Sequence, residues 1–351
     1  MKKRESYACM LLINDIHLSK DNISDFQKNW DEALRICTEH SINTLVVGGD
    51  LWQSRTGQTL STLMAAREAV LKAAQMNIYI ILEPGNHDKV DQESILSYSH
   101  IFSEYPNVDV IDDYAGYDVS DKTILWLISY FPENGSFVEK INEVIQKLPS
   151  NKTNILYCHE GINGALTSSS DKELATSIFK PFDKVLVGHY HDRTTLDDGR
   201  IEYIGASRQH NYGEDENKGY TILYSDGTTK FVQNRINVRY KTITVSPTDL
   251  ESAKSMLQQT CSDQTKVRLK ITCTADEAAN IDKNLLMELG ASKVEVSTET
   301  ILSYAKVQDL NTKFNKEGLK EEYSRFCIQK EFENMEMGLK YLDKIDDSCG
   351  N

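Results

Sequence analysis

The chain of 351 residues has no uninterrupted apolar run that approaches the length of a membrane-spanning helix. Its N-terminal stretch also lacks the basic start, apolar core and cleavage site of a secretory signal. The seven cysteines are scattered and form no Cys-x-x-Cys pair, which argues against a disulfide framework and against a zinc finger. We therefore expect a soluble, cytoplasmic protein with reduced thiols and no membrane partner.

The sequence is also poor in positive charge. Lysine and arginine total 39 against 53 acidic residues, so the formal net charge is −14. Binding of nucleic acid by the whole surface is disfavoured, because neutralising phosphates requires clustered lysine and arginine. This acidity is compatible with a local basic path on the surface, with a basic partner, or with cations held by carboxylates. Composition alone does not choose between these three possibilities.

Five short apolar runs each end at side chains of the kind that bind metals. Such runs, bounded by turn residues, are typical of buried strands, and ligands gather just beyond the strand ends of open α/β sheets. We therefore expect the five ends to converge on one polar site. The runs and their ends are 10–13 with Asp15 and His17, 45–47 with Asp50, 79–82 with Asn86 and His87, 155–157 with His159, and 185–187 with His189 and His191.

Strand-like runs alternate with helical stretches from residue 7 to about 235, which is the pattern of a layered α/β fold. One helix is expected to begin at Ser24, where Ser24 and Gln27 fit a capping box ahead of an apolar face. Further helices are expected at 59–76 and 137–148. Beyond the last histidine pair we expect short strands at 201–204, 220–224 and 230–232, with a hairpin turn at Asp226-Gly227.

A second α/β unit is expected after residue 240, with strands at 240–245, 266–272 and 293–296 and helices at 248–259 and 275–289. From about residue 311 the chain is charged, and its apolar positions change register, which indicates two short amphipathic helices. The first set is Leu319, Tyr323 and Phe326, and the second is Ile328, Phe332, Met335, Leu339 and Leu342. The predicted domains are 1–238, 239–300 and 301–351.

The side chains at the five strand ends suit a pair of divalent cations. A ligand set of aspartate, asparagine and histidine without cysteine suits borderline-hard divalent ions such as Mn²⁺, Fe²⁺ or Zn²⁺ better than a thiolate site would. Seven candidates exceed what one ion requires, and two ions roughly 3.5–4 Å apart polarise a phosphate and generate a hydroxide nucleophile. One shared carboxylate would bridge them, and a further histidine near the leaving oxygen would either stabilise the charge there or supply a proton.

The ordered set of motifs resembles the signature of the calcineurin-like metallophosphoesterase superfamily, although each motif alone is weak. The motifs are Asp15-Ile16-His17, Gly49-Asp50, Gly85-Asn86-His87-Asp88, His159 and Gly188-His189-Tyr190-His191. The resemblance implies an α/β fold: a layered β-sandwich metallophosphoesterase domain flanked by helices, then a small α/β capping domain and C-terminal helices.

The same resemblance implies individual roles and two divalent metal ions, with Mn²⁺ expected. His87 would be the catalytic histidine that binds no metal, and Asp88 the carboxylate that orients it. One ion would be held by Asp15, His17, Asp50 and His191, and the other by Asp50, Asn86, His159 and His189, so that Asp50 is the bridge.

Three features resemble the SbcD-type DNA nucleases of this superfamily. They are the segments 203–207, 211–214 and 218–220, the serine-rich stretch 168–173, and the order of catalytic domain, capping unit and C-terminal helices. This resemblance implies an exo- and endonuclease subunit of an SbcCD-like complex in DNA-end processing, repair or defence. Its partners would be DNA, an SMC-type coiled-coil ATPase held by the C-terminal helices, and a second copy of the chain.

Two other functions remain open. A phosphatase or small-molecule phosphodiesterase of the same superfamily would hydrolyse generic phosphoesters without a partner, and would leave the C-terminal helices unexplained. A catalytically inactive scaffold would retain the fold for protein binding, but the complete set of candidate ligands disfavours it.

Several side chains outside the ligand set are candidates for contact with DNA. SbcD-type enzymes often carry His or Asp three residues beyond the bridging aspartate, whereas this chain has Gln53, which cannot ionise and leaves double-strand exonuclease activity open. Arg55 either faces a phosphate or is a solvated loop residue, and His210 either lines a DNA groove or is structural. Alternation in one strand puts Lys266, Arg268 and Lys270 on one face, either as a DNA-backbone track or as an ordinary solvated face.

Overall fold

A computed structural model of the chain describes residues 6–166, 173–298, 316–329 and 335–342. The chain divides into two compact units, one of which runs to Ile243 and also holds Glu251–Leu269 and Lys283–Val294. Most of the serine-rich stretch 168–173 and the apolar residue Phe332 lie outside the described residues. Among the described helices, none is both long enough and apolar enough to cross a lipid bilayer.

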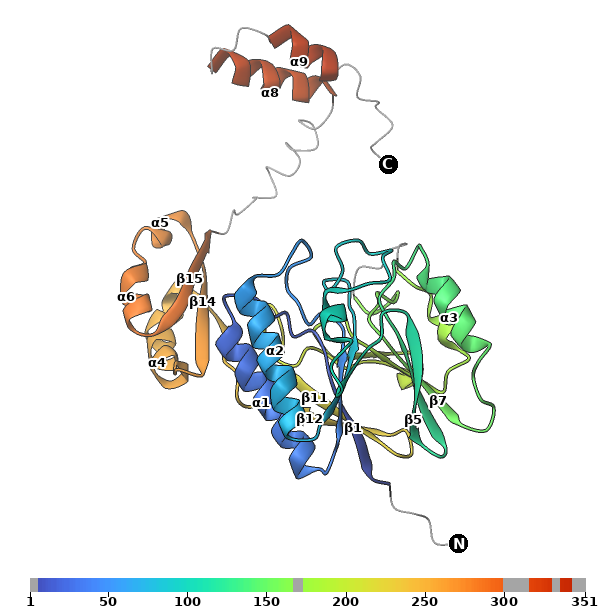
Figure 1. Cartoon of the computed structure of the whole chain (residues 1–351). Coiled ribbons are helices and arrows are strands. Elements are labelled where there is room, and N and C mark those ends of the chain that lie inside the picture. Colours follow the sequence, from blue (N-terminus) through green and yellow to red (C-terminus); the bar gives the residue numbers. More distant parts are fainter. Residues whose placement is uncertain (1–5, 167–172, 299–315, 330–334, 343–351) are drawn as a thin grey trace. The chain divides into compact units, whose positions relative to one another are not determined.

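The first unit is built on two six-stranded sheets that pack face to face (Figure 1). In the first sheet the order is β12-β11-β1-β2-β3-β4; β1 to β4 are parallel, β11 pairs antiparallel with β1, and β12 pairs antiparallel with β11. Its strands are β1 (Ala8–Ile13), β2 (Thr44–Gly48), β3 (Tyr79–Glu83), β4 (Val108–Val110), β11 (Gly219–Tyr224) and β12 (Thr229–Gln233).

The second sheet has the order β5-β6-β7-β8-β10-β9, and its central strands β6, β7, β8 and β10 are parallel. The edge strands β5 and β9 pair antiparallel with their neighbours. Its strands are β5 (Tyr114–Ser120), β6 (Thr123–Ile128), β7 (Thr153–Cys158), β8 (Lys184–Val187), β9 (Thr194–Leu196) and β10 (Ile201–Tyr203). Both sheets therefore have parallel centres whose carboxyl ends carry the candidate ligands.

Each central strand is buried on both faces. In β1, Met10 and Leu12 point into the core between the sheets, where Tyr157 of β7 also lies. Leu11 and Ile13 point the other way and pack with the helices that cover the first sheet. This alternation with period two explains why the strands are continuous apolar runs rather than patterns of polar and apolar residues.

Helices cover the outer faces of the two sheets, which completes the layered α/β sandwich predicted from the sequence (Figure 1). The helices α1 (Ile23–Glu39) and α2 (Leu60–Gln75) pack on the first sheet, and α3 (Phe137–Ile145) packs on the second. Three short 3₁₀ helices lie in the connections, at Tyr98–Phe102, Thr176–Phe179 and Asp197–Gly199.

The predicted capping box at Ser24 and Gln27 is wrong. Helix α1 begins at Ile23, and Asn22 is its N-cap residue without a capping side-chain hydrogen bond. The Asn22 side chain is engaged elsewhere, because its Oδ1 accepts from Ser19 N at 2.9 Å and its Nδ2 donates to His17 O at 2.7 Å. This asparagine therefore holds the backbone of a candidate metal ligand instead of closing the helix.

A three-stranded sheet of order β13-β14-β15 follows, as the sequence predicted, with β13 (Arg239–Val245), β14 (Thr265–Cys273) and β15 (Ala291–Thr298). Its first helix comprises a 3₁₀ turn, Pro247–Asp249, and α4 (Leu250–Thr260). The single helix expected at 275–289 is instead two, α5 (Ala275–Ala278) and α6 (Lys283–Glu288). Asn280 interrupts it, since its side chain donates to Asp276 O at 3.2 Å and competes with helical hydrogen bonding.

Two helices near the C-terminus, α8 (Lys316–Gln329) and α9 (Met335–Leu342), confirm the predicted break in register. The predicted grouping is wrong at Ile328, which belongs to α8 and is largely exposed. Gly338 of α9 lies against the Tyr323 ring of α8. A Cβ atom at position 338 would clash with that ring.

Candidate metal centre

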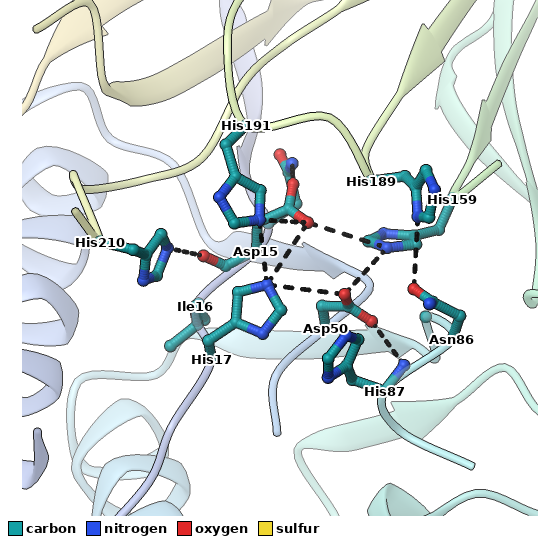
Figure 2. Close-up of polar contacts among 12 residues, drawn as sticks. Asp15, Ile16, His17, Asp50, Asn86, His87, His159, His189, His191 and His210 are labelled. Carbon is teal, nitrogen blue, oxygen red and sulfur yellow. Dashed lines mark hydrogen bonds and ion pairs between the residues drawn. The ribbon is translucent and has the colours of Figure 1, made fainter. Parts of the chain in front are cut away.

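The candidate ligands come together from both sheets (Figure 2). Asp15, His17, Asp50 and Asn86 follow β1, β2 and β3 of the first sheet. His159, His189 and His191 follow β7 and β8 of the second sheet. The predicted convergence of five strand ends is therefore present in the structure, and it spans the gap between two facing sheets rather than one open edge.

Backbone hydrogen bonds hold the segments after β1 and β2 side by side. Asp15 N donates to Gly49 O at 3.1 Å, and His17 N donates to Asp50 O at 2.9 Å. Four of the candidate ligands adopt positive φ angles that non-glycine residues rarely take: Asp15 at 49°, His17 at 50°, Asp50 at 52° and His189 at 85°. Each such residue costs about 1–3 kcal/mol and is characteristically found at functional sites.

Asp15, His17 and His191 form one group whose ligand atoms lie within 4.8 Å of one another. The Nε2 atoms of His17 and His191 are 3.1 Å apart, and they lie 4.0 and 3.9 Å from Asp15 Oδ1. His17 Nε2 is also 3.6 Å from Asp50 Oδ2. This group has the composition expected of the first metal site.

Asp50 also contacts the remaining candidates. Its Oδ2 lies 3.3 Å from His159 Nε2, and His159 Nε2 is 3.7 Å from Asp15 Oδ1 as well. The Asn86 amide oxygen is 3.3 Å from His189 Nδ1 and 3.2 Å from both carboxylate oxygens of Asp50. Both carboxylates therefore reach the two groups, but Asp50 lies closer than Asp15 to His17 and to His159 and also contacts Asn86, as the predicted bridge would.

The donor set fits cations. Asp15 Oδ1 is buried and has no hydrogen-bond partner among the described residues. The Asn86 amide lies 3.2 Å from both Asp50 carboxylate oxygens, and either its oxygen or its nitrogen can face them, depending on the orientation of the amide. Rotated by 180°, the same amide would donate to Asp50 and accept from the Arg55 guanidinium, which suits the protein without metal.

Burial and neighbouring charges shift the pKa values of these groups. Burial lowers the pKa of His17 and of His189 to about 3, so both imidazoles are neutral near pH 7, which is the form that binds metals. Burial alone would raise the pKa of Asp50, but the neighbouring His159, His17 and His87 together outweigh it and hold the pKa low. His159 in turn has a raised pKa, because Asp50 and Asp15 overcome its desolvation. Burial also raises the pKa of Asp15.

His87 lies at the edge of this centre, and its orienting partner differs from the prediction. His87 N donates to Asp50 Oδ1 at 2.8 Å, and its ring Nδ1 lies 2.7 Å from the main-chain oxygen of Gln53. The Asp88 carboxylate, expected to orient His87, instead accepts from the backbone amides of Trp52 at 2.9 Å and Gly85 at 2.7 Å. Asp88 therefore fixes the loops that carry Asp50 and Asn86.

A pocket of about 310 Å³ opens over the centre. Its wall includes His210, whose Nε2 lies 2.8 Å from Asp15 O and whose ring is 5.1 Å from that of His17. The other lining residues are His17, Asp50, Gln53, Arg55, Asn86, His87, His189, His191 and Asn211. The structure thus brings Gln53, Arg55 and His210 to the site.

The three predicted cations of β14 are not among the residues that line this pocket. Lys266, Arg268 and Lys270 do share one face of the strand, since the intervening Val267, Leu269 and Ile271 are fully buried. Their alternation is therefore confirmed, while a contact with DNA stays a prediction.

The family model of calcineurin-like phosphoesterases matches residues 10–193, the span that carries every candidate ligand. The chain belongs to this family. Calcineurin-like phosphoesterases use a dimetal site, and this chain has candidate ligands for metal ions in the matched span. The α/β architecture with two large sheets agrees with that fold.

Relatives of this calcineurin-like phosphoesterase align at low identity. Protein 078R of Invertebrate iridescent virus 3, which is named as an inferred phosphoesterase, is 23% identical to this chain over 312 residues. The alignment covers 85% of this chain and 87% of the viral protein. The SbcD component of nuclease SbcCD from Staphylococcus epidermidis is 25% identical over 206 residues, or 51% of this chain and 54% of that component.

Solved structures align at lower identity still. A dimetal phosphatase from Danio rerio has a TM-score of 0.44 at 11% identity and covers 61% of this chain and 91% of that chain. Nuclease MPE of Pseudomonas putida has a TM-score of 0.27 at 17% identity and covers 55% of this chain and 66% of that chain.

Two residues that support the phosphoesterase centre were missed in the sequence. Asn14 receives a hydrogen bond from the buried Tyr157 hydroxyl at 3.1 Å and donates to Asp15 Oδ2. Glu214 Oε1 lies 2.9 Å from His191 Nδ1. Asn14 stands directly before the first ligand motif and could have been suspected. Glu214 lies 23 residues beyond His191, in the segment 211–214, whose resemblance to SbcD-type nucleases gives no indication of a contact with a metal ligand.

Proposed function

We propose that this phosphoesterase is a two-metal phosphodiesterase that hydrolyses DNA, as the nuclease subunit of an SbcCD-like complex. The observation that carries the phosphodiesterase part is the placement of Asp50 between the two groups of candidate ligands, with the partly exposed His87 beside it. Two divalent ions held there would polarise a backbone phosphate and supply a hydroxide nucleophile near neutral pH.

The chain's own residues would complete the reaction as follows. Hydroxide attacks phosphorus in line, the bond from phosphorus to the leaving oxygen breaks, and that oxygen takes a proton from His87 Nε2. The Gln53 carbonyl accepts from His87 Nδ1 at 2.7 Å, so it holds the ring in one orientation and stabilises the imidazolium that donates the proton. Arg55 lines the pocket, where its guanidinium would pair with an anionic substrate.

The choice of DNA is supported by the alignment with an SbcCD nuclease component over 51% of the chain. The cationic face of β14 and the pair α8 and α9 agree with a capping unit and a partner-binding segment. An SMC-type ATPase bound by those helices, a homodimer and Mn²⁺ as the working ion are part of this proposal. The ligand set of carboxylate, amide and imidazole suits Mn²⁺.

The test is digestion of linear single- and double-stranded DNA by the full chain with Mn²⁺, beside Asp50→Asn, which keeps the side-chain shape and removes the bridging charge. We expect cleavage by the wild-type protein and none by Asp50→Asn. Turnover of a generic phosphomonoester without DNA cleavage, even with a candidate ATPase present, would contradict the nuclease function and favour the phosphatase alternative.

A further inference from the structure

We propose that Glu214 is a positioning residue, whose carboxylate holds His191 in the tautomer and orientation that bind the first metal ion. This inference rests on the two-metal function proposed above. It assigns a role to a loop residue that shares no motif with the ligands.

The geometry around His191 distinguishes its two ring nitrogens. Nδ1 lies 2.9 Å from Glu214 Oε1, whereas Nε2 lies 3.1 Å from His17 Nε2 and 3.9 Å from Asp15 Oδ1. A carboxylate can only accept, so the proton of a neutral imidazole stays on Nδ1 and the lone pair stays on Nε2. The nitrogen that faces the other ligands is therefore the one free to bind a metal.

Glu214 is itself held in place before it holds His191. Its Oε2 accepts from His210 N at 3.0 Å, and its Oε1 accepts from Asn211 Nδ2 at 2.9 Å. The side chain is only 8% exposed. His210 from the same loop also reaches the centre, because its Nε2 lies 2.8 Å from Asp15 O. One loop thus fixes the ligand from β8 and the backbone of the ligand from β1.

Glu214 is the first of three consecutive acidic residues, and the other two point to different partners. Asp215 pairs with Lys218 at 3.0 Å, and Glu216 pairs with Lys241 at 3.3 Å. Acidity of the loop therefore does not explain the contact with His191. Carboxylates that accept from the second nitrogen of a metal-binding histidine typically contribute about 10–100-fold to metal affinity.

The test is calorimetric titration of the metal-free full chain with Mn²⁺, comparing wild type, Glu214→Gln and the matched control Glu216→Gln. Both variants remove one charge from the same loop. We expect Glu214→Gln to weaken one of the two Mn²⁺ sites about 10–100-fold and to leave the other unchanged. Glu216→Gln should titrate like the wild type. Raising Mn²⁺ should restore the kcat of Glu214→Gln, because the variant loses affinity for the ion and keeps the reacting groups.

A third variant separates positioning from a purely structural role. Glu214→Asp keeps the charge at a shorter reach, so we expect the Mn²⁺ affinity of its weakened site to lie between those of wild type and Glu214→Gln. Equal Mn²⁺ affinities in wild type and Glu214→Gln would overturn the proposal. A wild-type protein that does not bind two Mn²⁺ ions would also overturn it. A purely structural role would be indicated if Glu214→Gln lost both Mn²⁺ sites and its thermal midpoint in EDTA fell, and if Glu214→Asp recovered neither property.

This titration and the DNA assay fail independently. A wild-type protein that binds two Mn²⁺ ions but cleaves no DNA would defeat the nuclease proposal and leave the effect of Glu214→Gln fully readable. Normal DNA cleavage with unchanged metal affinity in Glu214→Gln would defeat the role of Glu214 alone.

Discussion

His87 illustrates how a single side chain can be recognised from sequence while its surroundings are not. Its place between Asn86 and Asp88 singled it out, but the oxygen that orients it belongs to the main chain of Gln53. Main-chain atoms are present at every position, so no pattern of residue types announces such a partner. The neighbouring carboxylate of Asp88 was the natural expectation, and it binds backbone amides instead.

Replacing His87 with alanine should lower kcat on a phosphodiester substrate by about 10²–10⁴-fold, because the leaving oxygen loses its proton donor. The measurement is turnover at saturating Mn²⁺, with the binding of Mn²⁺ titrated on the same sample. We expect both ions to bind as in the wild type. The ring nitrogen of His87 lies within 4.8 Å of ligand atoms of His17 and Asp50, so loss of one ion in this variant would identify His87 as a ligand instead.

The residues that the structure brings together at the centre could be named from the sequence, because strand ends and motif spacing are local properties, and their binding of metal ions stays a prediction. Glu214 could not, because its contact with His191 depends on a loop that returns to the centre after two further strands. In the sequence, the segment 211–214 resembles SbcD-type nucleases, which indicates a DNA substrate. The structure gives this segment a physical task at the metal centre.

At the scale of elements, tight turns after β2 and β8 bring the two sheets' ligands within reach. Gly49 has φ of +93°, and a Cβ atom there would lie 2.0 Å from His159 Nδ1. A Cβ atom on Gly188 would lie 2.6 Å from the same nitrogen. The His159 ring therefore fits between Gly49 and Gly188 only because neither residue has a side chain. Its Nδ1 lies 3.0 Å from Gly48 O.

Gly49→Ala should destabilise the protein and weaken Mn²⁺ binding, because the new methyl group displaces His159. Gly164→Ala is the matched control: its φ is +94°, but the nearest atom to its Cβ is Leu196 Cδ2 at 3.7 Å. We expect Gly164→Ala to cost about 1–2 kcal/mol from backbone conformation alone, and Gly49→Ala to cost more. Urea unfolding of the metal-free proteins measures both, and equal costs with intact Mn²⁺ binding would contradict the packing argument.

Elements with strong periodicity were predicted well, and those without it were not. The face of α1 built from Phe26, Trp30 and Ala33 is buried as expected. Strands β4, β5 and β6 were not expected from the sequence at all. Strand β5 is only partly buried and therefore lacks a clear alternation, and β4 has only three residues. Strand β6 is buried throughout, but it contributes no ligand that would have drawn attention to it.

At the scale of the molecule, the centre joins two sheets that are otherwise held together by an apolar core. The first sheet supplies two carboxylates, and the second supplies three imidazoles. Divalent ions bound between them would therefore cross-link the layers. The domain boundaries 1–238, 239–300 and 301–351 stay predictions, because the two compact units divide the segment after Ile243 differently.

Adding Mn²⁺ should raise the free energy of unfolding of the metal-free protein. The ligands are brought together only in the folded state. Free Mn²⁺ at about 100 times the dissociation constant should therefore raise the free energy of unfolding by about 2.7 kcal/mol for each site. Urea denaturation with Mn²⁺ and with EDTA measures this difference. Asp50→Asn serves as the control, since loss of the bridge should remove most of the gain; a full gain in that variant would argue against Asp50 as the shared ligand.

The main-chain contact of His87 has a consequence for how the family can diversify. Any residue at position 53 except proline can present the same carbonyl, because Gln53 N must still donate to Leu18 O at 3.0 Å. The side chain at position 53, in the pocket wall, can therefore be exchanged while the ring of His87 keeps its orientation. Position 53 is a place where substrate preference can drift over evolutionary time without loss of the underlying chemistry.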